Sequence, residues 1–341
     1  MVAPATSSLA GLEFADPALE ASVRAGLERV EARLRVAVSS EFGFVTETAR
    51  HLMEAGGKRF RPLLALLAAH FGDPAAAGVV ESAVVVELTH LATLYHDDVM
   101  DEATARRGAI SANSRWGNTV AILTGDYLFA QASDVLADLG PEAVRVQART
   151  FARLVTGQIR ETAGPPPGED PIEHHLLVLA EKTGSLIATS ALFGATFASV
   201  PAEQAEALHR YGEAVGIAFQ LSDDLLDITA ERVESGKVPG TDLREGISTL
   251  PVLFALRSAE APDPAADPDA ARLRELLAGP VPEESIAEAL ALLRASPAVD
   301  AAGAVLRSYA DRAHDLLAEL PDVPARAALE TLADFVVSRT G

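Results

Sequence analysis

Two stretches decide the fold and the chemistry: LTHLATLYHDDVMD, residues 88–101, and AFQLSDDLLD, residues 218–227. In each, apolar residues recur at helical spacing and lead into a DDxxD pattern. Positions i, i+1 and i+4 of a helix lie close together, so each pattern presents three carboxylates to shared cations. Hard oxygen ligands of this kind suit Mg²⁺. Both patterns continue apolar helices, and we therefore interpret them as metal sites rather than solvated surface charge. The candidate ligands are Asp97, Asp98, Asp101, Asp223, Asp224 and Asp227.

The rest of the chain has the same helical character. Ala and Leu dominate its 341 residues and aromatic residues make up only 5%, which favours helix over sheet. The pattern predicts an all-α fold without a convincing strand pair, in a single domain over 1–341 that begins with a disordered N-terminal extension, 1–12. The expected helices cover residues 19–38, 61–71, 79–100, 120–139, 143–159, 185–199, 202–228, 250–258, 270–277, 285–295, 301–317 and 325–338.

Charge and composition exclude several kinds of protein. The net charge of -21 argues against nucleic acid and against anionic lipid surfaces as partners. The absence of cysteine excludes disulfides and thiolate zinc sites. The apolar runs 60–71 and 83–95 are too short for a membrane span or are interrupted by Glu, His and Arg, and residues 1–10 lack the pattern of a signal peptide. We expect a cytoplasmic protein with no transmembrane segment.

Basic residues complement the acidic clusters. The stretch GGKRFRP, residues 56–62, places three cations between a glycine pair and a proline suited to the first turn of a helix, and such a loop can bind an anion. Arg106 and Arg107 follow the first acidic cluster closely. Only three of the 28 basic residues are lysines, and two of them, Lys182 and Lys237, lie in glycine-bearing breaks between helices. Each of these features could also be an ordinary turn or a counter-ion.

Two further polar residues lie on the helices of the acidic clusters. His90 precedes the first cluster by about two helical turns and lies on the same face, so we favour a functional role for it. Gln220 could bond substrate or metal-bound water, although a packed helical glutamine is the simpler interpretation.

Taken together, residues 56–62, His90, DDVMD with the following RRG, Lys182-Thr183, 220–227 and 236–246 resemble the trans-prenyl diphosphate synthase family in order and spacing. This resemblance implies the isoprenoid synthase fold, a bundle of long helices around a deep central cavity, assembled as a homodimer. It also implies that isopentenyl diphosphate is condensed onto an allylic diphosphate.

The resemblance carries residue roles with it. The six aspartates would ligate Mg²⁺ ions that bridge to the allylic diphosphate. Three ions per active site would be expected, and Mn²⁺ could replace Mg²⁺. Arg106, Lys182 and Lys237 match direct cationic contacts of that diphosphate, and Gln220 matches a residue of the allylic side. Together with the aspartates, Lys182 and Lys237 would be the catalytic residues. The isopentenyl diphosphate site would be formed by Lys58, Arg61, His90 and Arg107.

One family position is changed. Many members have a lysine after the second cluster, in Gly-Lys-x-Thr-Leu-Pro, whereas residues 246–251 here read GISTLP. Ile247 therefore replaces a cation, which bears on substrate affinity more than on the type of reaction.

The helix ending at Asp97 is expected to line the cavity, so residues one, two and three turns upstream would limit the length of the product. These positions are Ala92 and Thr93, then Thr89, then Val86. Short-chain members typically have a bulky aromatic at the first level, and both residues here are small. The eleven residues from Val86 to Asp97 span ~16 Å, enough for several isoprene units. A medium- to long-chain product is therefore expected, with a short-chain farnesyl or geranylgeranyl product as the alternative.

Three other functions stay open from the sequence. A class I terpene cyclase also ionises an allylic diphosphate, but it needs no second diphosphate site. A non-catalytic or regulatory subunit of a heteromeric synthase would be expected to have eroded acidic motifs, and both motifs here are intact. A helical scaffold that binds divalent ions would not explain the ordered basic motifs.

Overall fold

The computed structural model describes residues 14–230, 239–258 and 267–339. Within these ranges the regular structure is helical, apart from one hairpin of two-residue strands, so the all-α prediction is confirmed. The N-terminal extension expected at 1–12 lies outside the described residues.

The chain divides into two compact units, which we describe separately. Unit 1 comprises residues 1–152, 186–212 and 316–331, and unit 2 comprises 153–185, 213–315 and 332–341. The elements that lie wholly in unit 1 are α1 (Pro17–Ala37), α2 (Gly43–Glu54), α3 (Phe60–Ala69), α4 (Val79–Met100), β1 (Ala105–Arg106), β2 (Ala109–Ile110), α5 (Ala112–Trp116) and α6 (Asn118–Leu139). Those of unit 2 are α8 (Pro171–Leu179), the π-helix η1 (Ala180–Gly184), α11 (Thr241–Glu245), α12 (Leu250–Ser258), α13 (Pro268–Leu276), the 3-10 helix η2 (Glu283–Ser285) and α14 (Ile286–Ala295). The division falls within or at the first residue of α7 (Pro141–Ala163), α9 (Ser185–Phe197), α10 (Ala202–Thr229), α15 (Pro297–Ala318) and α16 (Pro324–Ser338).

Three helices begin in the same way. Asp16, Asp170 and Asp267 each precede a proline at the start of α1, α8 and α13, and each accepts a hydrogen bond from a backbone amide of the first turn at 2.8, 2.8 and 2.9 Å. The carboxylate satisfies an amide that has no partner within the helix, and proline supplies a preset φ without an N–H. These local signals explain why the helices begin where they do.

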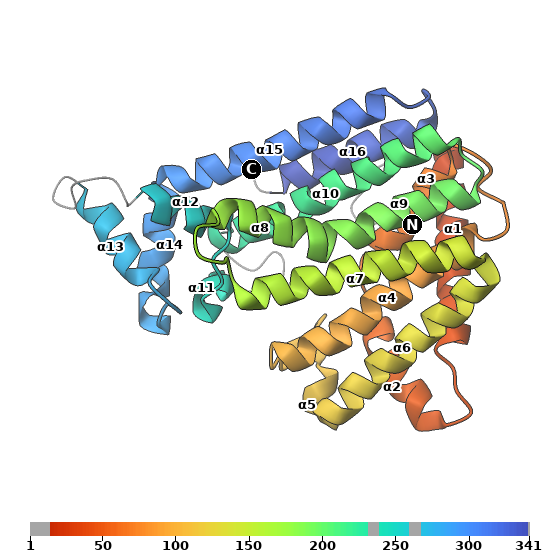
Figure 1. Cartoon of the computed structure of the whole chain (residues 1–341), viewed down its shortest axis with the longest axis horizontal. Helices are drawn as coiled ribbons and strands as arrows, with labels where there is room; N and C mark the ends of the chain where they lie inside the picture. Colours follow the sequence, from red (N-terminus) through yellow and green to blue (C-terminus); the bar gives the residue numbers. More distant parts are fainter. Residues whose placement is uncertain (1–13, 231–238, 259–266, 340–341) are drawn as a thin grey trace, which may run out of the picture. The chain divides into compact units, whose positions relative to one another are not determined.

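The core of unit 1 is built around α4, which packs along α6 and against α3 and α1 (Figure 1). Apolar residues cover α4 on all sides, and most of its side chains from Val79 to Ala92 are buried. A helix that is apolar all round is expected in the centre of a protein rather than at its surface. Because α4 ends in the first aspartate cluster, this packing fixes where that cluster lies.

A buried ion-pair cluster ties α1, α3 and α4 together. Arg59, just before α3, has a positive φ of 47°, and only 11% of its side chain is exposed. Its guanidinium donates to Glu87 at 3.0 Å, to Glu31, and to the carbonyl of Met53 at 2.8 Å. Burial would lower the pKa of Arg59, but the hydrogen bond to Glu31 and the charges of both carboxylates raise it above its usual value. Glu87 lies within α4 with 1% of its surface exposed. Of the three cations expected to form an anion-binding loop, Arg59 therefore serves the fold.

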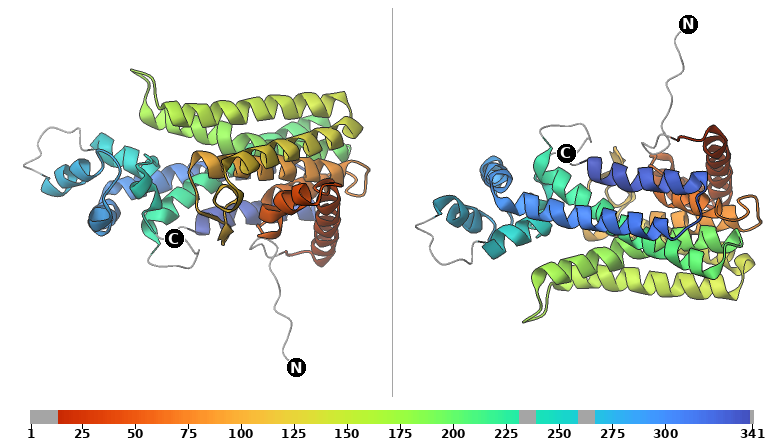
Figure 2. Two further views of the ribbon diagram at one scale, coloured as in Figure 1. Left: turned by 90° about the horizontal axis from the view of Figure 1, so that it is seen from below. Right: turned by 90° about the horizontal axis from the view of Figure 1, so that it is seen from above.

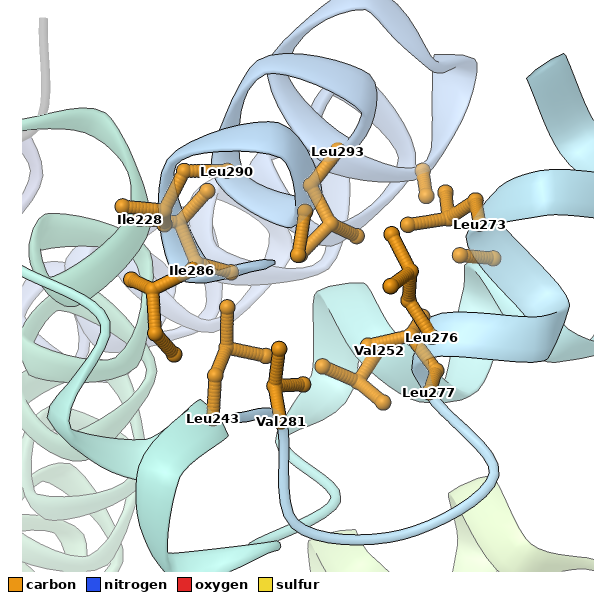
Figure 3. Packing of buried hydrophobic residues seen from close by; sticks show 13 residues of the cluster. Ile228, Leu243, Val252, Leu273, Leu276, Leu277, Val281, Ile286, Leu290 and Leu293 are labelled. Carbon is orange, nitrogen blue, oxygen red and sulfur yellow. The ribbon is translucent and has the colours of Figure 1, made fainter. Parts of the chain in front are cut away.

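Unit 2 has its own apolar core at the end of α10. Ile228 forms a cluster with residues from α11, α12, α13 and α14, and the labelled side chains in Figure 3 lie close together. The short helices 268–295 pack as a compact group (Figure 2). This core anchors α11, which contacts the second aspartate cluster.

The continuous helical stretch Pro171–Phe197 is long and apolar enough to cross a membrane, and a bent pair of helices, Glu283–Ala295 with Pro297–Ala318, passes the same test together. In the single stretch, 61% of the most apolar window is buried inside the protein. Helices in the core of water-soluble proteins commonly have this length and composition, so the stretch does not indicate a membrane protein.

The Arg59–Glu87 pair predicts a large stability effect. Replacing Glu87→Gln leaves Arg59 buried with one carboxylate fewer, and we expect the free energy of unfolding to fall by about 3 kcal/mol, as for other broken buried pairs. Urea denaturation followed by circular dichroism measures this change. Glu20→Gln is the matched control, because it breaks the exposed Arg24–Glu20 pair and should cost less than about 1 kcal/mol. Equal losses in the two variants would show that Glu87 does not hold this part of the fold.

Candidate active site

The first aspartate cluster lies at the carboxyl end of α4. Asp98 is fully buried, and its Oδ1 accepts a hydrogen bond from Arg106 Nε at 2.6 Å. Arg106 Nη2 also lies 3.7 Å from Asp101 Oδ2. Burial raises the pKa of Asp98 although the bond from Arg106 opposes the rise. Carboxylates are unfavourable at the negative end of a helix dipole, and Arg106 offsets part of that cost.

A tight hairpin positions the two arginines that follow. Ala105 pairs with Ile110 and Arg106 with Ala109, which leaves Arg107 and Gly108 as a two-residue loop. Their φ values are 53° and 76°, and positive φ at both positions is typical of a type I′ hairpin turn. The hairpin was not predicted from the sequence, because its strands are too short to show an alternating pattern. Its consequence is that Arg106 and Arg107 contact different parts of unit 1.

Arg107 packs over the glycine pair before α3. Its Nη1 donates to the carbonyls of Leu52 at 3.1 Å and Gly56 at 2.5 Å. A Cβ at Gly57 would lie 2.9 Å from Arg107 Cζ, and Gly57 has a φ of 147°. Only glycine satisfies both the backbone conformation and the close approach. The glycine pair, predicted from the sequence only as part of an anion-binding turn, therefore also makes room for a guanidinium.

Arg61 and His90 complete this cationic cluster. Burial lowers the pKa of Arg61 to about 10 despite the attraction of Glu87, so its guanidinium stays charged at neutral pH. Burial, and then the charges of Arg61 and Arg107, lower the pKa of His90 well below its usual value. His90 Nε2 lies 3.5 Å from Arg107 Nη2, and since a guanidinium only donates, Nδ1 carries the proton. Three of the four residues predicted to hold isopentenyl diphosphate are thus brought together, and Lys58 is exposed in the adjoining loop.

In the second aspartate cluster each carboxylate has a different protein partner. Asp223 Oδ1 accepts from Arg339 Nη2 at 2.7 Å. Asp224, 5% exposed, accepts from Gln220 Nε2 at 3.1 Å, so the predicted Gln220 lies in this cluster. Asp227 accepts the first two amides of α11, from Thr241 at 3.2 Å and Asp242 at 3.1 Å, and thereby caps that helix.

A histidine also approaches Asp224. His175 Nε2, from α8, lies 3.4 Å from Asp224 Oδ2 without forming a hydrogen bond, and both atoms are buried. Neither His175 nor Arg339 was predicted from the sequence, since both are far from residues 223–227 in the chain. Periodicity and local motifs give no signal for such contacts.

Lys182 projects from a π-helix. One turn of wider helix, η1, interrupts the run from α8 to α9 at Ala180–Gly184, and such turns are frequent at functional sites. Lys182 Nζ donates to Glu161 of α7 at 2.5 Å. A Cβ at Gly157 would lie 2.6 Å from the Lys182 backbone nitrogen, so α7 packs directly on the wider turn. Lys237 lies outside the described residues, and Ile247, at the position of the missing lysine, is 43% exposed.

The chain-length positions differ in their surroundings. Thr93 is partly exposed, whereas Ala92 and Val86 have no exposed surface. Thr89 is 1% exposed and accepts a hydrogen bond from Gln147 Nε2 of α7 at 2.7 Å. Thr93 is therefore the position with free surface from which a neighbouring molecule could be contacted.

The carboxylates fit a hard divalent cation. Asp98 Oδ2 and Asp224 Oδ2 are buried without a hydrogen-bond partner, which is costly for a carboxylate unless a cation satisfies it. Among the residues that the structure describes, no group of three His, Cys, Asp or Glu side chains forms a ready-made metal cage. Mg²⁺ needs no such cage, because it keeps several waters and uses one or two carboxylates with substrate phosphates.

The cationic cluster predicts an unusual titration of His90. We expect its imidazole to stay neutral under conditions in which an ordinary histidine is already charged, and inorganic pyrophosphate to raise its pKa, since an anion beside it favours the charged form. The unfolded chain takes up this proton near pH 6.5 and the folded chain does not, so the free energy of unfolding falls as the pH drops below that value. NMR titration of the histidine ring signals, assigned with His90→Gln, measures both effects.

His70 provides the matched control, because burial lowers its pKa too but the charge that acts on it is Asp16 rather than an arginine cluster. Its titration should not respond to pyrophosphate. A free-protein pKa of His90 at or above 6.5 would contradict the cationic environment described here.

Comparison with known proteins identifies the family. Residues 43–293 match the model of the polyprenyl synthetase family. The chain is 53% identical to a nonaprenyl diphosphate synthase of Mycobacterium tuberculosis over the whole of both chains. It is 43% identical to a dimethylallyltranstransferase of the same organism, over 96% of this chain and 98% of the relative.

Solved structures agree with these sequence relatives. A geranylgeranyl pyrophosphate synthase from Corynebacterium glutamicum, complexed with calcium and isoprenyl diphosphate, superimposes with a TM-score of 0.86 at 47% identity, covering 97% of this chain and 100% of that one. A decaprenyl diphosphate synthase from Rhodobacter capsulatus gives 0.84 at 34% identity, covering 95% and 98%. The resemblance found in the motifs is confirmed, and the chain belongs to the polyprenyl synthetase family of prenyl-transferring enzymes.

Proposed function

We propose that this enzyme condenses isopentenyl diphosphate with an allylic diphosphate and releases a medium- to long-chain polyprenyl diphosphate. The observation that carries the proposal is the cationic cluster of Arg61, Arg107 and neutral His90 beside the first aspartate cluster in unit 1. A condensing enzyme needs one site for a metal-bound diphosphate and another for a diphosphate held by cations alone. A terpene cyclase would need only the first.

The aspartates of both clusters would hold Mg²⁺, for which Mn²⁺ is a chemical substitute, with three ions as the expected number. When bound, the metal neutralises the allylic diphosphate and favours its departure. Asp98 and Asp224 each contribute a buried oxygen that accepts no hydrogen bond from the protein. Arg106, already bonded to Asp98, would turn its remaining donors to the same diphosphate, and Gln220 orients Asp224 for this role.

The cations would bind the two substrates. Lys182, on its π-helical turn, and Lys237 would contact the allylic diphosphate. Arg61 and Arg107 would hold isopentenyl diphosphate by charge, while neutral His90 donates a single hydrogen bond from Nδ1. No side-chain nucleophile is required, because the double bond of isopentenyl diphosphate attacks the allylic carbon. The departing diphosphate is a sufficient base for the final proton loss.

Product length would be set along α4. Thr93 supports a long product because it is small and keeps free surface, and Ala92 at the same level is also small. Thr89 and Val86 add no bulky side chain at the deeper levels. The 53% identity to a protein named nonaprenyl diphosphate synthase also supports it. The 47% identity to a geranylgeranyl pyrophosphate synthase keeps the short-chain product as the second candidate.

We further propose that the chain works as a single-domain polyprenyl synthase in a cytoplasmic homodimer. Exposed apolar side chains on α6, Ile122 at 42% and Leu123 at 60%, support contact with a second copy. The net charge of -21 supports a protein that does not bind nucleic acid.

An assay with labelled isopentenyl diphosphate and each allylic starter in turn tests the reaction. We expect turnover that requires both substrates and is abolished by EDTA. Asp98→Asn and Asp224→Asn should lower kcat by about 100-fold or more, because metal binding contributes several kcal/mol to the transition state. Consumption of the allylic diphosphate without isopentenyl diphosphate would instead indicate a cyclase, and inactivity of the pure chain would indicate a subunit of a heteromeric enzyme.

A second assay tests the product length. Thr93→Phe should shorten the product while turnover is retained, because the ring would project from the partly exposed face of α4. Chromatography of the dephosphorylated lipids measures the distribution. Thr93→Val is the matched control, since it keeps the side-chain volume and should leave the product unchanged. An unchanged distribution in Thr93→Phe would exclude Thr93 from the tunnel wall.

A further inference from the structure

Arg339 makes an ion pair that the family assignment does not account for. It lies after α16, outside the residues 43–293 that match the family model, and is 116 residues from its partner Asp223. Only 16% of the Arg339 side chain and 25% of that of Asp223 are exposed. A pair so far apart in the chain and so little exposed is not an incidental surface contact.

The guanidinium is held in place from a second direction. Arg339 Cζ lies 5.0 Å from the ring centroid of Phe219, one helical turn before Asp223 on α10. A cation over an aromatic face is attracted by the ring, and more strongly where water is excluded. Arg339 therefore follows one face of α10 to reach the carboxylate. Its Nη1 is buried without a hydrogen-bond partner, so the arginine is not fully satisfied by this arrangement.

The partners of the three aspartates are chemically different. Asp224 is bonded to a neutral amide and Asp227 to two backbone amides, and such groups orient a carboxylate without cancelling its charge. Arg339 instead contributes a full positive charge, directly on Asp223. A cation at that distance stabilises the metal-free carboxylate, and it also repels any second cation that binds there.

We propose that Arg339 is the resident counter-ion of Asp223, and that a divalent cation must displace its guanidinium in order to bind the second cluster. The inference rests on the proposed function only in taking Asp223 as a metal ligand. In this role Arg339 orients Asp223 in the metal-free protein, and it lowers the affinity of the cluster for free metal.

Metal binding tests the proposal directly. In Arg339→Gln, the affinity for Mn²⁺ should rise by about tenfold. This factor corresponds to the repulsion expected between a divalent cation and a guanidinium about 5 Å apart in a water-like medium. Loss of the EPR signal of free Mn²⁺ measures the affinity. Arg339→Lys keeps the charge and should stay near the wild-type affinity. If Arg339 only oriented Asp223, its removal would weaken metal binding, and if it were only structural, the affinity would not change. Either result would overturn the proposal.

A double-mutant cycle assigns the effect to the right carboxylate. In an Asp223→Asn background, Arg339→Gln should no longer raise the affinity for Mn²⁺, because the charge it competes for is gone. A persistent increase would place the competition elsewhere. Arg272→Gln is the matched control for net charge, since Arg272 lies in the same unit and pairs with Glu275 and Glu288 at the surface. Its affinity should equal that of the wild type.

The Nε–H NMR signal of Arg339, assigned with Arg339→Gln, gives a readout that does not depend on activity. It should move on addition of Mg²⁺ and stay fixed in Asp223→Asn; a signal that does not respond to Mg²⁺ in the wild type would contradict displacement. These metal-binding measurements do not require prenyl transfer. A protein without prenyl transferase activity can therefore still confirm or contradict the competition between Arg339 and the metal, so the two failures are distinguishable.

Discussion

A buried negative charge, Glu87, is the constraint on which the arrangement of unit 1 depends. This carboxylate is 1% exposed in the middle of α4, and its charge attracts Arg59, Arg61 and Arg107. Burying a carboxylate is costly unless cations surround it, and gathering arginines is costly unless a carboxylate lies among them. Each requirement satisfies the other. The hydrogen bonds of Arg59 are made within the protein, whereas Arg61 and Arg107 retain N–H donors for an anion beside His90. The cationic cluster proposed to bind isopentenyl diphosphate is thus assembled around a buried carboxylate, Glu87.

The two aspartate clusters differ in the interactions that stabilise their closely spaced carboxylates. In the first, one arginine from a neighbouring hairpin bonds Asp98 and approaches Asp101. In the second, each aspartate has its own partner, since Arg339 neutralises Asp223, Gln220 orients Asp224, and the start of α11 fixes Asp227. In both clusters a buried oxygen of the second aspartate remains without a hydrogen-bond partner. Carboxylates that are oriented but not fully satisfied are suited to bind a divalent cation.

Helix existence was largely predictable because it is a local property. The predicted bounds of α4 and α12 agree with the structure, and α10 differs by one residue at its end. The helices that were missed, α2, α5, α8 and α11, are short or polar on much of their surface, so periodicity gave little signal. The π-helix at Lys182, which Gly157 of α7 approaches closely, was also missed, because helical periodicity does not distinguish a π-turn from an α-helical one. The hairpin that places Arg106 and Arg107 depends on two positive φ values that only Gly108 hinted at.

The fold class, the two carboxylate clusters and the family were predictable from the amino-acid sequence, since these depend on spacing along single helices and on the order of motifs. The pairing of charged side chains could be seen only in the tertiary structure. Arg59 pairs with the buried Glu87, and Arg107 packs directly over Gly57. Arg339 and His175 contact the second aspartate cluster from segments that contain no recognisable motif. The reason is the distance along the chain over which each effect acts. Helix periodicity is visible within one or two turns, whereas buried charges pair with residues that the fold brings together from distant parts of the chain.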